Sequence, residues 1–138
     1  MIPDPVRQIL ESDALAHLAT VNADGSPHVT CAWVGVDGDD IVIATVSDQR
    51  KLANMRREPR VTLSFETDRR NDWGLTEYLV VYGTASITEG GAPELLQELA
   101  YTYIGPGVKF PTMPDPPPGF VTRVRPERYS GVGPWSGS

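Results

Sequence analysis

Short apolar runs separated by tight-turn signals constrain the fold of this chain most strongly. The pair Asp37-Gly38 stands between two such runs, and an Asp-Gly pair in this setting is typical of a two-residue β-hairpin turn. Val61, Leu63 and Phe65 alternate with polar residues, as in a strand with one buried face. These criteria predict six strands, at residues 15–21, 28–36, 41–46, 61–65, 77–88 and 120–124.

Helical patterns accompany the strands at three places. Pro5 suits the first position of a short helix near the start of the chain. A second helix is expected over residues 47–57, capped by Ser47, and a third over residues 94–104, where leucines recur at helical spacing. Hairpin-joined strands with few helices favour a mainly β fold, an antiparallel barrel of six strands formed by one domain over residues 1–138.

Composition restricts the function classes. A formal net charge of -6 disfavours nucleic-acid binding. Cys31, the single cysteine, can form no internal disulfide, so a reducing cytoplasmic location is expected, and strand alternation predicts a buried thiol there. The sequence shows neither a secretion signal nor an apolar run long enough to span a bilayer, so no membrane association is expected. His17 and His28 lack zinc-site spacing, so no metal is expected.

A cluster of basic residues is the clearest sign of a binding site. Five of the 12 basic side chains lie between positions 50 and 60, in an otherwise acidic chain. A helix that starts just after a strand presents free N–H groups, which favour anions such as phosphate. Thr45, Ser47 and Gln49 add short donors beside Arg50 and Lys51. Charge alone leaves two interpretations open, an anion cradle and a solvated helix face.

The order of these segments resembles a known family. A strand ending in small hydroxyl residues is followed by Arg50-Lys51, then Asn54, then Arg-Arg-Glu-Pro-Arg at 56–60 and another strand. This pattern is similar to the pyridoxamine-phosphate-oxidase-like, or flavin and deazaflavin oxidoreductase, superfamily, and within it to the actinobacterial branch that uses coenzyme F-420. The resemblance extends over about residues 14 to 88.

The resemblance implies a Greek-key split β-barrel and a homodimer with two cofactor sites at the subunit interface, where the partner covers the far side of the ring. Lys51 and Arg50 would hold the phosphate or acidic tail, and Asn54 would stabilise the turn. Thr45, Ser47 and Gln49 would assist. The second strand would lie along the tricyclic ring, with the residues Val29, Thr30, Cys31, Ala32 and Trp33.

Two departures from the family pattern bear on the substrate. Pyridoxamine phosphate oxidases carry an Arg-x-x-x-Leu-Lys element on the second strand and an Arg-x-His element near the C-terminus. Residues 28–34 contain no arginine or lysine, and residues 125–128 contain no histidine, so vitamin B6 chemistry is not expected. We expect an F-420-dependent reductase because five basic residues suit a long acidic tail. FMN and a non-enzymatic carrier remain alternatives.

The expected substrate is a small unsaturated or carbonyl compound, since hydride chemistry belongs to the cofactor. Trp33, Trp73 and Tyr78 are candidate walls of its pocket, and no residue is singled out as catalytic. The proline-rich segment 111–119 is predicted to be an extended loop. Trp135, on a glycine-rich tail, is predicted to be exposed and to anchor an interface rather than to cover the ring.

Overall fold

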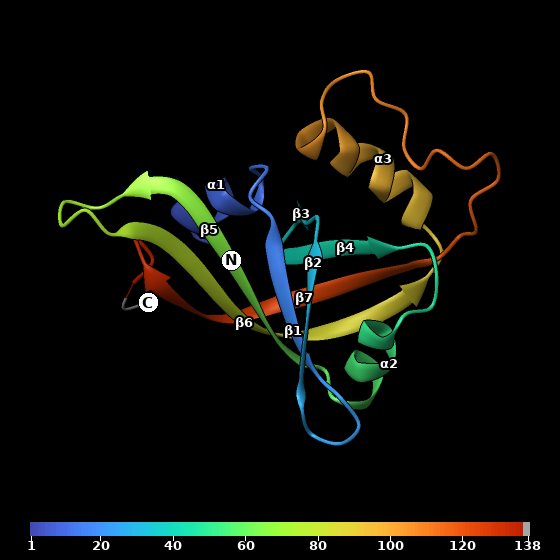
Figure 1. Cartoon of the computed structure of the whole chain (residues 1–138), viewed down its shortest axis with the longest axis horizontal. Coiled ribbons are helices and arrows are strands. Elements are labelled where there is room, and N and C mark those ends of the chain that lie inside the picture. The colour runs from blue at the N-terminus through green and yellow to red at the C-terminus, as the bar shows by residue number, and fades with distance from the viewer. Residues whose placement is uncertain (137–138) are drawn as a thin grey trace.

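The computed structural model describes residues 1–136, which form one antiparallel sheet of seven strands with three helices (Figure 1). The strand order is β2-β1-β5-β6-β7-β4-β3. None of these helices is long and apolar enough to cross a membrane. The elements are α1 (Asp4–Leu10), β1 (Ala16–Val21), β2 (Pro27–Ala32), β3 (Gly35–Asp37), β4 (Asp40–Thr45), α2 (Arg50–Arg57), β5 (Arg60–Arg70), β6 (Thr76–Glu89), α3 (Ala92–Tyr103) and β7 (Phe120–Val132).

The prediction of one strand over residues 28–36 is wrong, and this raises the strand number from six to seven. The first part, β2, pairs with β1, whereas the second part, β3, pairs with β4. Between them Val34 is buried, as the chain passes from one end of the strand order to the other. The predicted hairpin turn is confirmed, because Asp37 pairs with Asp40 and Gly38 has a φ of 63°, which glycine adopts readily.

The last strand is much longer than the predicted 120–124. It continues to Val132 because the equally long β6 pairs with it along most of its length. Pro126 cannot donate to the sheet, and the pairing register shifts where it faces Gly83. The irregularity predicted at Gly83 is found beside it, but the extra residue is Glu127 of β7, and a Cβ at Gly83 would lie 2.6 Å from the carbonyl oxygen of Arg125.

The main core lies on the inner face of the curved sheet, where α1 and α2 cover it. Phe65 and Leu63 of β5 are fully buried there, together with Leu10 of α1 and Leu52 of α2. Helix α3 packs elsewhere, against β4 and β7, and its buried Leu99 lies outside this cluster. The two short helices therefore complete the core, and α3 forms a separate layer (Figure 1).

The C-terminal tail contributes to the core, so the prediction of an exposed Trp135 is wrong. Its side chain is 2% exposed, and its Nε1 donates a hydrogen bond of 3.0 Å to the carbonyl oxygen of Tyr78. Gly133 has a φ of 155°, and a Cβ there would lie 2.5 Å from the indole ring. The glycines that suggested a loose tail are instead what lets the chain fold back over its own tryptophan.

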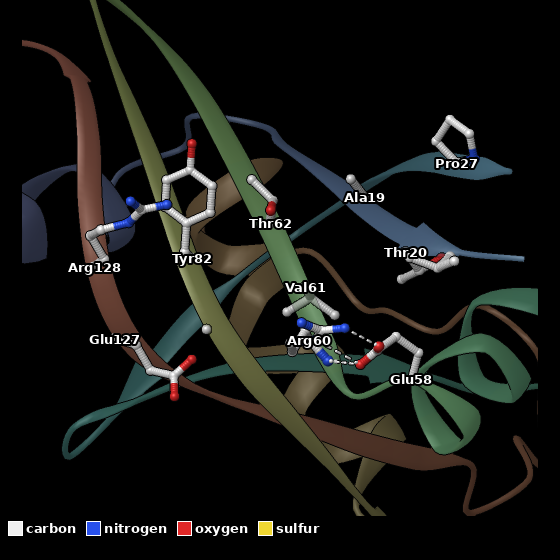
Figure 2. Close-up of a pocket in the computed structure, with 12 residues that line it drawn as sticks. Ala19, Thr20, Pro27, Glu58, Arg60, Val61, Thr62, Tyr82, Glu127 and Arg128 are labelled. Atoms are coloured by element: carbon white, nitrogen blue, oxygen red, sulfur yellow. Dashed lines mark hydrogen bonds and ion pairs between the residues drawn. The ribbon is translucent and has the colours of Figure 1, made fainter. Parts of the chain in front are cut away.

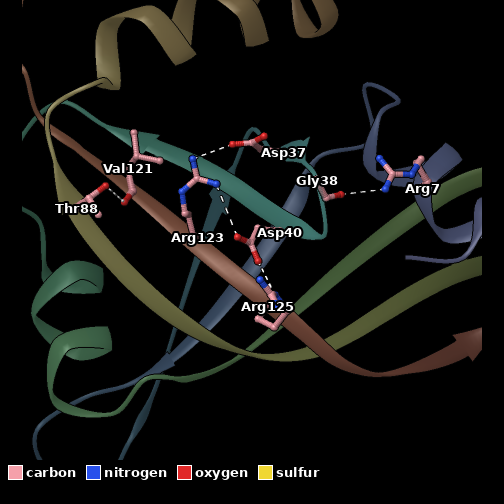
Figure 3. Close-up of polar contacts among 8 residues, drawn as sticks. All are labelled: Arg7, Asp37, Gly38, Asp40, Thr88, Val121, Arg123 and Arg125. Carbon is pink, nitrogen blue, oxygen red and sulfur yellow. Dashed lines mark hydrogen bonds and ion pairs between the residues drawn. The ribbon is translucent and has the colours of Figure 1, made fainter. Parts of the chain in front are cut away.

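Surface ion pairs hold the β3–β4 hairpin onto β7 (Figure 3). Arg123 pairs with Asp37 at 2.8 Å, and Arg125 pairs with Asp40 at 2.6 Å. Arg7 of α1 donates to the carbonyl oxygen of the hairpin turn at 2.9 Å. The pairs are solvent-exposed, so each contributes little to stability by itself. Together they fix the position of a strand of only three residues at the edge of the sheet.

Candidate functional site

The connection from β4 to α2 carries the predicted anion-binding residues. β4 ends at Thr45, and α2 begins at Arg50 rather than at the predicted Ser47 start. Gln49 precedes the helix with extended backbone, and no side chain caps the first turn. The first N–H groups of α2 therefore lack a side-chain acceptor, and such a helix start attracts anions.

Three of the five clustered basic residues have partners within the protein. Arg56 pairs with Asp48 at 3.1 Å and also lies over the ring of Phe120. Arg60 pairs with Glu58 at 2.6 Å. Arg57 donates hydrogen bonds to the carbonyl oxygen of Val21 and to the side-chain oxygen of Asn54. These three arginines stabilise the local structure. For them the interpretation of the cluster as a solvated helix face, without a ligand, is sufficient.

Arg50 and Lys51 differ from these three, because neither has a hydrogen bond or ion pair within residues 1–136. Arg50 is exposed, whereas Lys51 is only 8% exposed. Burial lowers the pKa of Lys51, since removing an ammonium group from water disfavours its charged form. A buried lysine without a counter-ion is costly unless a bound anion supplies one.

A pocket of about 350 Å³ connects Lys51 to the predicted ring-binding strand. Its lining residues come from β2, β4, α2, α3 and the segments beside them, and are Leu15, Cys31, Ala32, Trp33, Ala44, Lys51, Leu96 and Phe110. The structure thus brings four predicted site residues together at one cavity, three of them adjacent on and after β2. Except for Lys51 and Cys31, the side chains that line it are apolar or aromatic.

Two buried hydroxyl groups of the predicted site lack hydrogen-bond partners within the described residues. The Oγ1 atoms of Thr30 on β2 and Thr45 on β4 are both in this state. Buried polar atoms are normally paired, so unpaired ones need a reason. Their strand neighbours Cys31 and Ala44 line the Lys51 pocket, so the two threonines lie on the other side of their strands and are not among the residues that line it.

Asn54 stabilises the turn, as predicted. Its side chain is buried, and its Nδ2 donates to Thr20 and to Asn22 at 3.0 Å each. The amide therefore ties α2 to the end of β1 and to the turn that follows. A second hollow of about 550 Å³ opens beside this joint, and its lining includes Arg50 and Arg57.

The remaining predicted contacts lie nearer the surface. Ser47 and Gln49 are exposed, and Gln49 donates weakly to Ser47 at 3.4 Å. Val29 is 59% exposed. The thiol of Cys31 is also exposed, so the prediction of a buried thiol is wrong. The physical reason is that β2 ends the strand order, so its outward face has no covering layer within the described chain.

Trp73 and Tyr78 are not brought to this pocket within one chain. Trp73 is 87% exposed and lies in the turn between β5 and β6. That turn is at the opposite end of the molecule from α2 (Figure 1). Tyr78 lies next to it on β6, where its backbone carbonyl accepts the hydrogen bond from Trp135. Their predicted role as pocket walls stays a prediction.

The C-terminal third supplies pocket residues that the sequence analysis missed. The ring of Trp33 stacks on Tyr103 at 5.4 Å and makes a tilted contact with Phe110 at 5.2 Å. The Tyr103 hydroxyl donates to the Ala14 carbonyl at 3.1 Å and accepts from the Val34 N–H at 3.0 Å. Burial raises the pKa of Tyr103. In the sequence, the aromatic residues at the end of the predicted third helix were the only indication that this segment packs against Trp33.

A third hollow, of about 480 Å³, is larger than the Lys51 pocket but contains none of the predicted site residues (Figure 2). It lies along β1, β5, β6 and β7. Glu58 pairs with Arg60 there, Arg128 lies 4.1 Å above the ring of Tyr82, and Glu127 accepts a hydrogen bond from Thr84 at 3.1 Å. The hydrogen bonds from Arg60 lower the pKa of Glu58 to about 2. Two acidic and two basic side chains line this hollow, so its charge does not favour an anionic ligand.

Comparisons with solved structures support the fold. A structure named F420 Reductase is 28% identical, with a TM-score of 0.76, and the match covers 94% of this chain and 98% of that one. A conserved hypothetical protein, Rv2991 from Mycobacterium tuberculosis, is 25% identical, with a TM-score of 0.73 and coverage of 99% and 85%. HutZ, a heme storage protein from Vibrio cholerae, is 16% identical, with a TM-score of 0.64 and coverage of 95% of both chains, which shows the fold alone.

No curated protein matches the sequence. A family model described as pyridoxamine 5'-phosphate oxidase matches residues 2–133, well beyond the segment that carried the resemblance. The predicted mainly β split barrel is therefore confirmed, with seven strands in place of six. The chain belongs to the pyridoxamine 5'-phosphate oxidase family.

Proposed function

We propose that this protein is a coenzyme F-420-dependent oxidoreductase that passes hydride to a small unsaturated or carbonyl compound. The observation that carries the proposal is the division of the basic cluster. Arg50 and Lys51 have no partner within residues 1–136, whereas the three neighbouring arginines do. The likeness to a structure named F420 Reductase supports the same class of cofactor.

The residues present fit an anionic, ring-containing cofactor. Lys51 would bind its phosphate or acidic tail from within the pocket, and Arg50 would bind it from the surface. The β2 strand, as an edge, has backbone groups free to bond the polar edge of a ring. A bound deazaflavin supplies the hydride, and the protein orients the acceptor and excludes water. Among the described residues that line the pocket only Lys51 and Cys31 titrate, so no acid–base residue is assigned.

FMN and a non-enzymatic carrier role are the competing proposals. FMN has a single phosphate, which Lys51 and the start of α2 could hold alone. Arg50 and Arg57 beside the hollow of about 550 Å³ supply two further cations for a longer acidic tail, against the one carboxylate of Asp24 there. A carrier would use the same pocket without an acceptor, and the fold it shares with a heme storage protein keeps this alternative in the test.

The proposal includes a homodimer with cofactor sites at its interface. Val29 and Cys31 are exposed on the outward face of β2, and apolar groups on an open sheet edge are normally covered. Trp73 and Tyr78 do not line the pocket of their own chain, and in the dimer they would act at the pocket of the partner subunit. Size-exclusion chromatography with light scattering tests the dimer.

The cofactor is tested by titrating the purified protein with F-420, FMN and heme while following absorbance and ring fluorescence. We expect F-420 to bind most tightly. Lys51→Glu should abolish binding, because it places a like charge against the anion. Arg56→Glu is the matched control, since it reverses the same charge on the same helix but at a residue already paired with Asp48.

The outcomes separate the three proposals. Tight FMN binding without a response to F-420 would replace the cofactor but keep the oxidoreductase. Heme binding alone would favour the carrier. Unchanged F-420 affinity in Lys51→Glu would refute the anion site whichever cofactor binds.

A further inference from the structure

The outer wall of the Lys51 pocket comes from α3 and the loop that follows it. Leu96 and Phe110 line the cavity from this side, facing the β2 end of the pocket. Both lie outside the segment of about 14 to 88 that carries the motif resemblance, but within residues 2–133 that the family model matches. The motif from Arg50 to Arg60 therefore does not predict this wall, and only the structure places it at the pocket.

One side chain, Gln97, holds the loop in place. Its Nε2 donates to the carbonyl oxygen of Val108 at 2.6 Å, and its Oε1 accepts from the N–H of Phe110 at 3.1 Å. The amide thus satisfies the backbone on both sides of Lys109, as a strand partner would. A glutamate at this position would accept from Phe110 but could not donate to Val108, and a methionine would do neither.

A second anchor holds Phe110 from the opposite direction. Its ring meets Trp33 at 5.2 Å with a tilt of 53°, and Trp33 stacks on Tyr103. The Tyr103 hydroxyl is in turn bonded to the backbone of Val34 and Ala14. The loop between α3 and β7, otherwise rich in proline and glycine, is therefore held at the pocket from two sides.

We propose that Phe110 forms the ligand-facing wall of the cofactor pocket within its own chain, and that Gln97 is the positioning residue for this wall. The inference rests on the proposed function. It gives the two ends of the pocket different parts of the ligand to bind. Lys51 binds the anionic group of the ligand, and Phe110 with Leu96 contacts its planar ring or the acceptor placed over it. The family resemblance alone implies that the partner subunit, and not this chain, covers the far side of the ring.

The wall is tested by the affinity and salt dependence of whichever cofactor, F-420 or FMN, binds the wild type. Phe110→Ala should weaken binding about tenfold, because it removes an aromatic contact and the apolar area beneath it. Phe110→Tyr, which keeps the ring, should stay within about twofold of wild type. The salt dependence of Kd should persist in Phe110→Ala, since salt screens the charged contact with Lys51 and not the contact with the ring.

The positioning role is tested in the protein without cofactor by amide hydrogen exchange over residues 108–112. Gln97→Met should increase exchange there. In a second sample, with cofactor bound, the same variant should alter the circular dichroism of the ring. Glu94→Met, on the exposed face of α3, should change neither signal. Gln97→Glu should give an intermediate exchange rate.

The two proposals fail differently. If neither cofactor binds the wild type, the proposed function is refuted. The role of Phe110 as a wall of the cofactor pocket is then refuted as well. If a cofactor binds and Phe110→Ala leaves its Kd unchanged, the proposed function stands and the wall is refuted. If Gln97→Met leaves exchange over residues 108–112 unchanged, the positioning role of Gln97 is refuted.

Discussion

Replacing Lys51 by methionine should move apo stability and cofactor affinity in opposite directions. Methionine has a similar length, and the position is 8% exposed, so the substitution keeps the packing and removes a buried charge without a partner. Without ligand we expect the free energy of unfolding to rise by about 1–2 kcal/mol, which is the usual gain when a functional site is relieved of strain.

Bound cofactor should reverse this order. A ligand at about 100 times its Kd stabilises the folded state by about 2.7 kcal/mol, and only the wild type would gain this. The wild type should therefore be the less stable protein alone and the more stable one in the presence of cofactor. Lys109→Met, at an exposed lysine, serves as the control and should change neither quantity.

The difference between the two proteins should also depend on pH. Burial lowers the folded-state pKa of Lys51 below its ordinary value of 10.5. Below this lowered pKa the lysine is charged in both the folded and the unfolded state, so the burial penalty is fully present. As pH rises through the lowered pKa towards 10.5 the folded protein loses the proton first, and the penalty disappears. The stability gap to Lys51→Met should narrow accordingly.

Urea unfolding followed by circular dichroism measures these quantities, with and without cofactor, at about neutral pH and near pH 9.5. A Lys51→Met protein that is less stable than wild type by about 1 kcal/mol or more without ligand would refute the reasoning. It would show that the ammonium group already has a stabilising partner. Wild-type cofactor affinity in this variant would refute the anion site itself.

Three further predictions concern other parts of the fold. Trp135→Ala should lower the free energy of unfolding, measured in urea, by about 3–5 kcal/mol. Trp135→Phe keeps a buried ring, so apart from the change in packing it should lose only about 1 kcal/mol, for the missing hydrogen bond. A loss below about 1 kcal/mol for Trp135→Ala would contradict the burial of the tail. Gly119→Ala should lower Tm markedly, because φ is +61° and a Cβ would lie 2.5 Å from the carbonyl oxygen of Thr45; an unchanged Tm would show that the backbone adjusts freely. In an NMR titration Glu58 should titrate at about 2, so its contribution to stability is present above its ordinary 4.5 and lost as pH falls towards 2. Arg60→Ala should return this pKa towards 4.5, and no change would exclude Arg60 as the cause.

Local patterns in the sequence determined the elements and the place of the binding segment. The turn at Gly38, the irregularity beside Gly83 and the presence of a second helix, although not its start at Arg50, depend on residues a few positions apart, so they can be predicted from adjacent residues. The same holds for the basic cluster from Arg50 to Arg60, whose position between a strand and a helix follows from the sequence. The resemblance then added the fold and the family.

Only the tertiary structure decided which of those charges are available to a ligand. Arg57 is engaged by the end of β1, which lies more than thirty positions earlier, whereas Lys51 meets no partner at all among residues 1–136. The split between β2 and β3, the burial of Trp135 and the placement of Phe110 beside Trp33 are likewise decided by pairings between distant segments. Sequence periodicity reports which face of an element is apolar, but not which distant element covers it, because that choice depends on the packing of the whole sheet.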